Sequence, residues 1–284
     1  MEDFLISVII LTYNRKETLI NALKSVYSQT YKKLEVIIID DCSSYNLENI
    51  LKENFKNYIY LRNQNRMGES FSRNRGLKIS SGDYIAFLDD DDVWEKEKLE
   101  LQLHTALALK KDVFLFCNDF SVRDKKYGWD RSIKSGFINF NKDKFYLNIS
   151  LTPPSCWFLS RNIISSIGYF DENLTVYEDL DYLVRILEKY PAYYLDKVLV
   201  KSGFCISHLS SLSIDNIKSK ETFLKKHFYK IKKDKDYLFR FYYCLGKDYL
   251  KLKFKKDARK FFLKSFILKP HKIELLFKIL KTFI

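Results

Sequence analysis

The chain has 284 residues, of which 46% are hydrophobic, and it contains only 8 Gly and 4 Pro. These values exclude a disordered or low-complexity protein and allow one large folded domain or a domain with an appendage. The net charge of +13 is concentrated in residues 201–284, where 22 Lys and Arg stand against 7 Asp and Glu.

Short apolar runs alternate with helical patterns through the first 117 residues. We expect strands at residues 6–11, 34–39, 58–61, 84–88 and 113–117, with helices in the intervals between them. Asn14 and Glu17 form a capping-box-like pair that predicts the start of the first helix. Strands this apolar, separated by helices, predict an α/β fold with a Rossmann-like, mostly parallel sheet and helices on both faces.

The second half of the chain continues with shorter elements and then becomes helical. We expect strands at 157–159 and 193–200, a short helix ended by Gly168, and a helix opened by Glu178 and Asp179. Lys-rich helical patterns then predict a domain at 1–213 and a basic α-helical region at 214–284. Seven residues of that region have the spacing of one tetratricopeptide repeat: Tyr242, Leu245, Gly246, Tyr249, Ala258, Phe262 and Pro270. This spacing predicts a helical hairpin.

Three polar clusters follow three of the expected strands. The clusters are Thr12-Tyr13-Asn14-Arg15, Asp40-Asp41, and Asp89 to Asp92. In open parallel sheets, ligands bind beyond the carboxyl ends of the strands. We therefore expect the three clusters to meet at one pocket on one edge of the sheet.

Four consecutive carboxylates repel one another unless a cation is bound. Two like charges about 4 Å apart repel by roughly 4 kcal/mol at a dielectric typical of protein surfaces. Hard divalent ions such as Mg²⁺ and Mn²⁺ take oxygen ligands and often bridge to phosphates. Asp89 and Asp91 are thus a candidate site for a metal ion and a diphosphate.

Two other interpretations of this acidic cluster stay open from the residues alone. It could be a solvated acidic turn that caps the helix containing Leu99. An apolar strand followed by Asp89, Asp91 and Val93 also fits the nucleophile loop of haloacid-dehalogenase-like phosphotransferases, although that loop usually lies near the start of its fold.

The order and spacing of several segments resemble glycosyltransferase family 2, which has the GT-A fold. The matching segments are SVIILTYNR at 7–15, VIIIDDCSS at 36–44, NRMG at 65–68, RNRG at 73–76, GDYIAFLDDDD at 82–92, GYFDE at 168–172 and EDLD at 178–181. The resemblance covers roughly residues 6–213, and Leu11 stands where the family usually has Pro. It implies an inverting glycosyltransferase that uses a nucleotide-diphosphate sugar, most commonly a UDP-sugar, and a divalent metal, Mn²⁺ or Mg²⁺.

The same resemblance implies roles for individual residues. Nucleotide-sugar contacts would come from Thr12, Tyr13, Arg15, Asp41, Arg73, Asp89 and Asp90, and metal contacts from Asp91 and Asp89. Tyr13 would stack on the base, Asp41 would accept a hydrogen bond from uracil, and His208 would contact the diphosphate. Ordinary loop and cap chemistry is the alternative for each, a surface salt bridge for Arg73, and a structural role for His208.

The segment that begins at Glu178 resembles the catalytic-base segment of the family. Inverting transfer is a single displacement, in which one carboxylate takes the proton of the acceptor hydroxyl. We assign this base to Asp179, with Glu178 as the second choice. The alternative is that both acids only favour a helix N-terminus.

The basic C-terminal region leads to expectations about partners and location. Lys-rich helices with aromatic residues suit an anionic membrane surface or nucleic acid, and we expect the membrane because no nucleic-acid motif is present. Family resemblance implies a glycan or lipid-linked glycan acceptor, as in lipopolysaccharide or capsule synthesis. Five dispersed cysteines, no signal peptide and no apolar run near 20 residues predict a cytoplasmic protein, peripheral at the inner membrane face.

Overall fold

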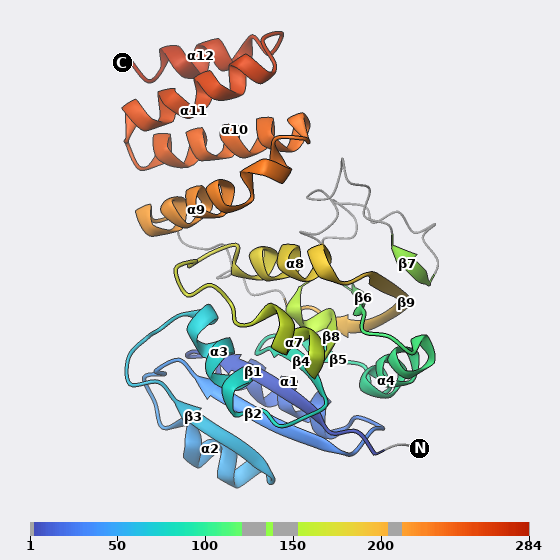
Figure 1. Ribbon diagram of the computed structural model, residues 1–284. Coiled ribbons are helices and arrows are strands. Elements are labelled where there is room, and N and C mark those ends of the chain that lie inside the picture. Colours follow the sequence, from blue (N-terminus) through green and yellow to red (C-terminus); the bar gives the residue numbers. More distant parts are fainter. Residues whose placement is uncertain (1–2, 121–134, 139–152, 204–211, 284) are drawn as a thin grey trace. The chain divides into compact units, whose positions relative to one another are not determined.

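The structure is a computed structural model that describes residues 3–120, 135–138, 153–203 and 212–283 (Figure 1). The described residues form two compact units. The first unit contains residues 3–138, 153–172 and 179–203, without the undescribed residues between 120 and 135, and the second contains residues 173–178 and 212–283.

The first unit is a mixed α/β domain. Its strands are β1 (Ile6–Thr12), β2 (Leu34–Asp40), β3 (Tyr58–Arg62), β4 (Tyr84–Asp89), β5 (Val93–Trp94), β6 (Phe114–Phe120), β7 (Gly136–Ile138), β8 (Trp157–Ser160) and β9 (Ala192–Lys201). Its helices are α1 (Lys16–Tyr27), α2 (Leu47–Asn54), α3 (Glu69–Ile79), α4 (Lys98–Leu109), the 3-10 turn η1 (Pro154–Cys156), α7 (Arg161–Ile167) and α8 (Glu178–Lys189). The strands and helices predicted from the sequence are thereby confirmed, with ends that differ by a few residues.

The strands of the first unit are joined in the order β3-β2-β1-β4-β8-β6-β9-β5, and β7 pairs with β9. The pairs β2–β3, β1–β2, β1–β4 and β6–β9 are parallel, whereas the pairs made by β5, β7 and β8 are antiparallel. The predicted parallel sheet is thus confirmed for its first four strands. The antiparallel pairs come from later, shorter strands.

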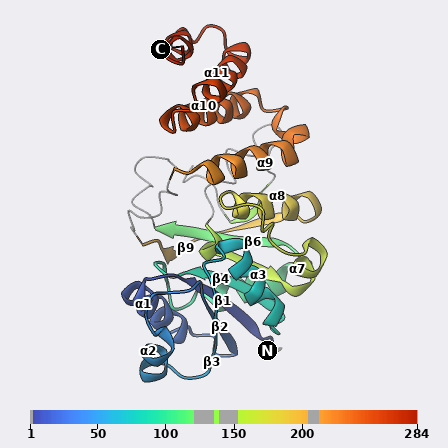
Figure 2. The ribbon, with the colours of Figure 1, turned by 90° about the vertical axis from the view of Figure 1, so that its left-hand side faces the viewer.

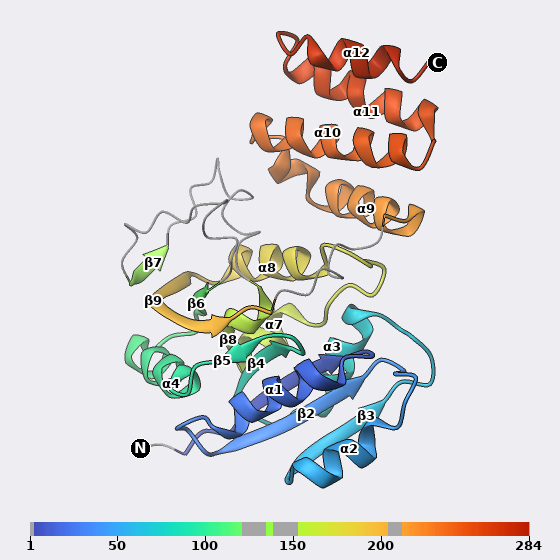
Figure 3. The ribbon, with the colours of Figure 1, turned by 180° about the vertical axis from the view of Figure 1, so that it is seen from behind.

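The order of the strands in the sheet explains which face each helix covers. From β1 to β3 each connection advances toward one edge, and the β3–β4 connection returns to the other side of β1. Because crossover connections between parallel strands are right-handed, this reversal moves the helix to the opposite face. Figures 1 and 3 show α1 and α2 on one face and α3 on the other. The reversal also makes the β1–β4 boundary a topological switch point, where ligands bind in such sheets.

The predicted capping role of Asn14 is wrong. Helix α1 begins at Lys16, and its N-cap is Arg15, which makes no side-chain cap bond. Asn14 has a positive φ of 54°, and its Oδ1 accepts hydrogen bonds from the backbone N (2.8 Å) and Oγ (3.0 Å) of Ser44. The side chain therefore ties the loop after β1 to the loop after β2, a long-range contact that the local pattern does not contain.

The second unit is helical. Its helices are α9 (Ile214–Ile231), α10 (Lys235–Lys251), α11 (Lys255–Leu268) and α12 (Glu274–Leu280), and consecutive helices are neighbours (Figure 2). Gly246 of α10 allows the close approach of α11, because a Cβ at this position would lie 2.7 Å from the Phe262 ring. The predicted helical hairpin is confirmed. No described helix is both long enough and apolar enough to cross a bilayer.

Candidate active site

The polar clusters predicted from the sequence follow neighbouring strands. In the register of the sheet, Thr12 of β1 pairs with Asp40 of β2, and Leu11 of β1 pairs with Asp89 of β4. The carboxyl ends of the three strands therefore lie at one edge, as expected. The acidic cluster Asp89–Asp92 begins at the switch point between β1 and β4.

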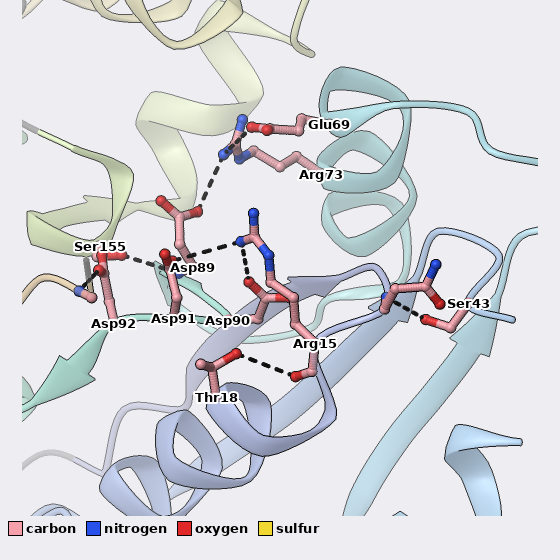
Figure 4. Close-up of polar contacts among 12 residues, drawn as sticks. Arg15, Thr18, Ser43, Glu69, Arg73, Asp89, Asp90, Asp91, Asp92 and Ser155 are labelled. Atoms are coloured by element: carbon pink, nitrogen blue, oxygen red, sulfur yellow. Dashed lines mark hydrogen bonds and ion pairs between the residues drawn. The ribbon is translucent and has the colours of Figure 1, made fainter. Parts of the chain in front are cut away.

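Arg15 brings the loop after β1 to the acidic cluster (Figure 4). Its Nη1 lies 2.8 Å from Oδ1 of Asp90 and 3.9 Å from Oδ1 of Asp91, and both carboxylates are almost fully buried. Burial raises the pKa of Asp90, and the Arg15 guanidinium opposes this rise by stabilising the charged form. Arg15 therefore offsets part of the negative charge of the cluster.

Arg73 of α3 pairs with a different carboxylate of the cluster. Its Nη2 lies 3.3 Å from Oδ1 of Asp89 and 2.9 Å from Oε2 of Glu69, and its side chain is only 3% exposed. Burial raises the pKa of Asp89 to about 6, against the opposing charge of Arg73. Arg73 therefore makes ion pairs with a guanidinium that is buried, not exposed at the surface, and its expected contact with a diphosphate stays a prediction.

Asp92 is bound by Gly203 and Ser155, and no ion pair joins it to Arg15 or Arg73 among the described contacts. Its Oδ1 accepts a hydrogen bond from the backbone N of Gly203 (3.0 Å), and the Ser155 hydroxyl also bonds to this carboxylate. Burial, followed by the charge of Asp89, raises the pKa of Asp92 to about 7. Ser155 Oγ also accepts a hydrogen bond from the backbone N of Asp89 (3.0 Å).

Ser155 and Gly203 are site residues that the sequence analysis missed. A Cβ on Gly203 would lie 1.9 Å from the carbonyl oxygen of Asp91, so only glycine fits beside the cluster. Ser155 follows Pro153 and Pro154, and Gly203 lies just after β9. Both are far from the cluster in sequence, and no local pattern distinguishes them.

Asp41 is fully engaged in contacts within the chain. Its Oδ1 accepts hydrogen bonds from Asn63 Nδ2 (2.8 Å) and Met67 N (2.7 Å), and its Oδ2 accepts one from Gly68 N (2.9 Å). These bonds fix the loop that leads into α3. The expected contact of Asp41 with a nucleotide base stays a prediction, and it would share the carboxylate with these donors.

Asp40 is completely buried and has a structural role. Its carboxylate accepts hydrogen bonds from the backbone N of Ser43 and the hydroxyl of Tyr60, each 2.8 Å long. These bonds hold the loop after β2 against β3.

Thr12, the last residue of β1, is buried, and Tyr13, which follows it in the loop, is partly exposed. The guanidinium carbon of Arg66 lies 4.4 Å from the centre of the Tyr13 ring. A planar cation therefore stacks on the aromatic face that the sequence analysis expects to receive a nucleotide base. Arg66 was not among the predicted site residues.

Asp179 lies at the start of α8, where its Oδ1 accepts a hydrogen bond from the backbone N of Leu180 (2.6 Å). Burial raises the pKa of Asp179, and the charge of Arg73 is the largest opposing influence. Arg73 thus acts electrostatically on both Asp89 and Asp179. Glu178 is buried and belongs to the second unit, whereas Asp179 belongs to the first. His208 lies outside the described residues.

The acidic cluster has a donor set that suits a divalent cation. Among the described side chains, no three His, Cys, Asp or Glu groups converge as a complete metal-binding set. Mg²⁺ is usually bound by only one or two carboxylates together with substrate phosphates. Asp91 and Asp89 supply hard oxygen atoms, and burial raises the pKa of Asp89. The residues therefore fit a cation that a diphosphate helps to coordinate.

The sequence of this chain matches a known family. Residues 7–168, more than half of the chain, match the profile of Glycosyl transferase family 2. The chain therefore belongs to this family. Membership accounts for the acidic cluster at the end of the fourth strand, and it replaces the haloacid-dehalogenase-like alternative.

Relatives in bacteria are similar over much of the chain. An uncharacterized glycosyltransferase of Rickettsia prowazekii, RP339, is 30% identical over 78% of this chain and 72% of its own length. The Escherichia coli UDP-Glc:alpha-D-GlcNAc-diphosphoundecaprenol beta-1,3-glucosyltransferase WfgD is 32% identical over 50% of this chain and 56% of its own length. An uncharacterized glycosyltransferase of Rickettsia bellii is 34% identical over 61% of this chain, which spans only 24% of that relative.

Solved structures share the fold at low sequence identity. S. aureus TarS 1-349 in complex with UDP-GlcNAc has a TM-score of 0.74 and 18% identity, covering 98% of this chain and 88% of that one. The mannosyltransferase PcManGT from Pyrobaculum calidifontis, in complex with GDP-Man and Mn²⁺, has a TM-score of 0.62 and 15% identity, covering 92% and 74%. These likenesses establish a GT-A fold, as the sequence resemblance implied.

Proposed function

We propose that this chain transfers a sugar from a nucleotide-diphosphate donor to an acceptor hydroxyl with inversion and with the help of a divalent metal. The observation that carries the proposal is the buried carboxylate cluster at the β1–β4 switch point. Arg15 of the loop after β1 pairs with Asp90, and Arg73 of α3 pairs with Asp89. A cluster with this place in a family 2 fold suits a diphosphate leaving group.

Different residues of the site would bind different parts of the donor. Asp91, with Asp89, would hold Mg²⁺ or Mn²⁺, which when bound supplies positive charge to the diphosphate leaving group. Arg15 orients Asp90 and Asp91 through its guanidinium. Tyr13 offers an aromatic face for the base, on which Arg66 now stacks. The diphosphate would thus be bound by the metal ion that the carboxylates hold and by the guanidinium groups.

We assign the general base to Asp179. A base for inverting transfer must be ionised, must lie beside the acceptor hydroxyl, and needs no covalent partner. Asp179 is partly buried, its charge is favoured by Arg73, and one oxygen is held by the backbone of Leu180. The second oxygen would take the acceptor proton.

The relatives suggest the class of donor and acceptor. The name of the E. coli relative WfgD specifies a UDP-sugar donor and a diphosphoundecaprenol-linked acceptor, and WcaA of E. coli is named as a putative colanic acid biosynthesis enzyme. We propose a UDP-sugar donor and a lipid-linked glycan acceptor for this chain, in the synthesis of a surface polysaccharide. Such an acceptor would place the enzyme at the inner face of the cytoplasmic membrane.

A thermal-shift titration tests the proposal. Uridine diphosphate should raise the melting temperature in the presence of Mn²⁺ or Mg²⁺ and not in the presence of a chelator. Asp91→Asn should abolish this metal-dependent gain. Asp215→Asn, which removes an exposed carboxylate at the start of α9, is the matched control and should keep it. If no nucleoside diphosphate stabilises the protein with either metal, the proposed function is wrong.

A further inference from the structure

The most exposed apolar side chains of the molecule are gathered near the end of the chain. Among the described residues, the five large apolar side chains with the highest exposure are Ile267 (77%), Ile273 (64%), Phe277 (64%), Phe283 (64%) and Leu280 (59%). All five belong to the last two helices of the second unit or to the residues that flank α12. Exposed apolar groups that cluster in this way mark interaction surfaces.

Helix α12 is apolar on two opposite sides. Leu275, Ile279 and Thr282 are buried and face the rest of the helical unit. The opposite side presents an exposed stripe, here called the α12 face, made of Ile273, Leu276, Phe277, Leu280 and Phe283. Their spacing of three and four residues places these side chains along one line of a helix. An exposed stripe of large apolar side chains on one helix marks a surface that binds a partner.

Arg259 of α11 fixes the end of the α12 face. Its Nη2 donates a hydrogen bond to the carbonyl oxygen of Thr282 (2.8 Å), and its Nε donates one to Thr282 Oγ1 (3.0 Å). The guanidinium carbon also lies 3.4 Å from the centre of the Phe283 ring. The stripe is therefore held in place by contacts within the folded unit.

The surroundings of the α12 face are strongly basic. Residues 252–284 contain 10 Lys and Arg and only 2 Asp and Glu, a local excess of +8. Lys272 and Lys281, which flank the helix, are both exposed. A basic helix that presents large apolar side chains has the composition of helices that lie in the interface of anionic bilayers.

We propose that the α12 face docks on an anionic lipid bilayer, with its apolar side chains at the level of the headgroups and its lysines on the phosphates. Charge decides against the other occupants. A second copy of this chain would oppose two surfaces of the same sign, and nucleic acid would leave the apolar stripe without apolar partners. Docking through the α12 face would bring the proposed transferase to a lipid-linked acceptor. Only this biological role of docking rests on the proposed function; binding to the bilayer itself does not.

Vesicle flotation with the full chain tests the proposal. The protein should float with vesicles of phosphatidylcholine containing 30% phosphatidylglycerol and stay in the soluble fraction with pure phosphatidylcholine. Phe277→Ser/Leu280→Ser should weaken binding to the anionic vesicles at least about tenfold, because two large apolar side chains no longer enter the bilayer. Lys272→Gln/Lys281→Gln should weaken it several-fold at low salt and less at high salt.

Matched controls separate the α12 face from general effects. Phe137→Ser changes an exposed phenylalanine of β7, and Lys32→Gln/Lys56→Gln removes two exposed lysines of the first unit. Both controls should bind vesicles like the wild type. Every variant should keep the melting temperature of the wild type, because each replaced side chain is exposed.

Three results would overturn the proposal. One is wild-type protein that does not float with anionic vesicles. Another is a Phe277→Ser/Leu280→Ser variant that floats as well as the wild type. The third is a wild-type dimer, in sedimentation equilibrium, that this variant converts to a monomer, which would assign the α12 face to a second copy. Stabilisation by uridine diphosphate is measured on the same samples, so a failure of docking is distinguishable from a failure of the proposed transferase.

Discussion

At the scale of single residues, two buried or half-buried arginines organise the site. Arg15 and Arg73 approach the acidic cluster from different elements, and each pairs with a different carboxylate. Arg73 also favours the charged form of Asp179. One guanidinium therefore stabilises the charges of a proposed metal ligand and of the proposed base.

The assignment of Asp179 as the base leads to a prediction about turnover. Asp179→Asn should lower transfer by about 10² to 10⁴, the usual contribution of general base catalysis, and leave donor binding within a few-fold of the wild type. Donor binding is measured by titration with uridine diphosphate, and transfer by release of the nucleotide. If the variant also loses donor binding, Asp179 is not the base, and Glu178→Gln is the next variant to test.

The burial of Asp179 also predicts a pH dependence. Because burial raises the pKa of Asp179, the charged form that accepts the proton is lost at a higher pH than for an exposed aspartate. The acid limb of kcat/KM in the wild type should therefore fall at a pH above the ordinary aspartate range. Transfer is measured between pH 4 and 8 as kcat/KM for the acceptor, with donor and metal saturating so that the acidic cluster stays occupied, and Asp179→Asn should lack this limb.

Lys98 gives a third prediction, about stability. Its side chain is completely buried, its Nζ donates a hydrogen bond to Gln102 Oε1 (2.7 Å), and Nζ lies 4.0 Å from the centre of the Trp94 ring. Burial lowers the pKa of Lys98 from 10.5 to about 8. Below pH 8 Lys98 is protonated in both the folded and the unfolded protein, so its buried charge destabilises the folded state. Between pH 8 and 10.5 the unfolded state binds more protons, and stability rises with pH.

Replacement of Lys98 removes this cost. Relative to the wild type, Lys98→Met should gain stability at pH 7, and the difference should shrink by roughly 1–3 kcal/mol by pH 10. Calorimetric unfolding of the first unit at both pH values measures the change. Lys24→Met, at an exposed position of α1, should show no such pH dependence. A constant difference across the pH range would mean that the pKa of Lys98 is the same in the folded and unfolded states, which would contradict the prediction.

At the scale of elements, local patterns in the sequence predicted most of the fold. The strands expected at residues 6–11 and 34–39 are β1 and β2, each one residue longer than expected, because their continuous apolar runs lie within the segments themselves. The contacts of Asn14, Ser155 and Gly203 could not be predicted in this way. Each joins loops that are 30 or more residues apart. The site residues at strand ends could therefore be predicted from the sequence. The site residues contributed by distant loops could not.

The segment 173–178, which leads directly into Asp179, is held by the helical unit. The backbone N of Val176 donates a hydrogen bond to Ser219 Oγ (3.2 Å), and the Tyr177 ring lies 5.3 Å from that of Phe223 and 5.9 Å from that of Phe241. Tyr177 also has a positive φ of 67°, a strained value for a bulky residue, which packing must stabilise. The helical unit thus fixes the residues immediately before the proposed base.

Loss of this packing should affect turnover more than donor binding. Tyr177→Ala should lower kcat by roughly tenfold or more, since small misplacements of a catalytic group are costly, and should leave the KM for the donor nearly unchanged. Tyr177→Phe keeps the ring and should restore most of kcat. Tyr229→Ala, which removes an exposed tyrosine of α9, is the control. Equal losses in both alanine variants would show that the effect is not specific to the segment before Asp179.

At the scale of the whole molecule, charge and apolar exposure are divided between the two parts of the chain. Residues 201–284 carry a net charge of +15, whereas the remaining residues carry a net charge of −2. The sequence predicted this separation and the helical character of the basic part. It could not predict that the last helix buries Leu275 and Ile279 and leaves Phe277 and Leu280 exposed, because α12 is apolar on both sides.

This division predicts that the α12 face affects the kinetics of transfer only when the acceptor is bound to a membrane. The same acceptor glycan would be offered either free in water or attached to a lipid diphosphate in vesicles containing 30% phosphatidylglycerol. Phe277→Ser/Leu280→Ser should leave kcat and both KM values unchanged with the soluble acceptor. With the vesicle-bound acceptor its apparent KM should rise about tenfold, because weaker docking lowers the local concentration of enzyme at the acceptor. Phe137→Ser should match the wild type in both assays. An equal loss with both forms of acceptor would mean that α12 acts through the fold of the enzyme and not through the membrane.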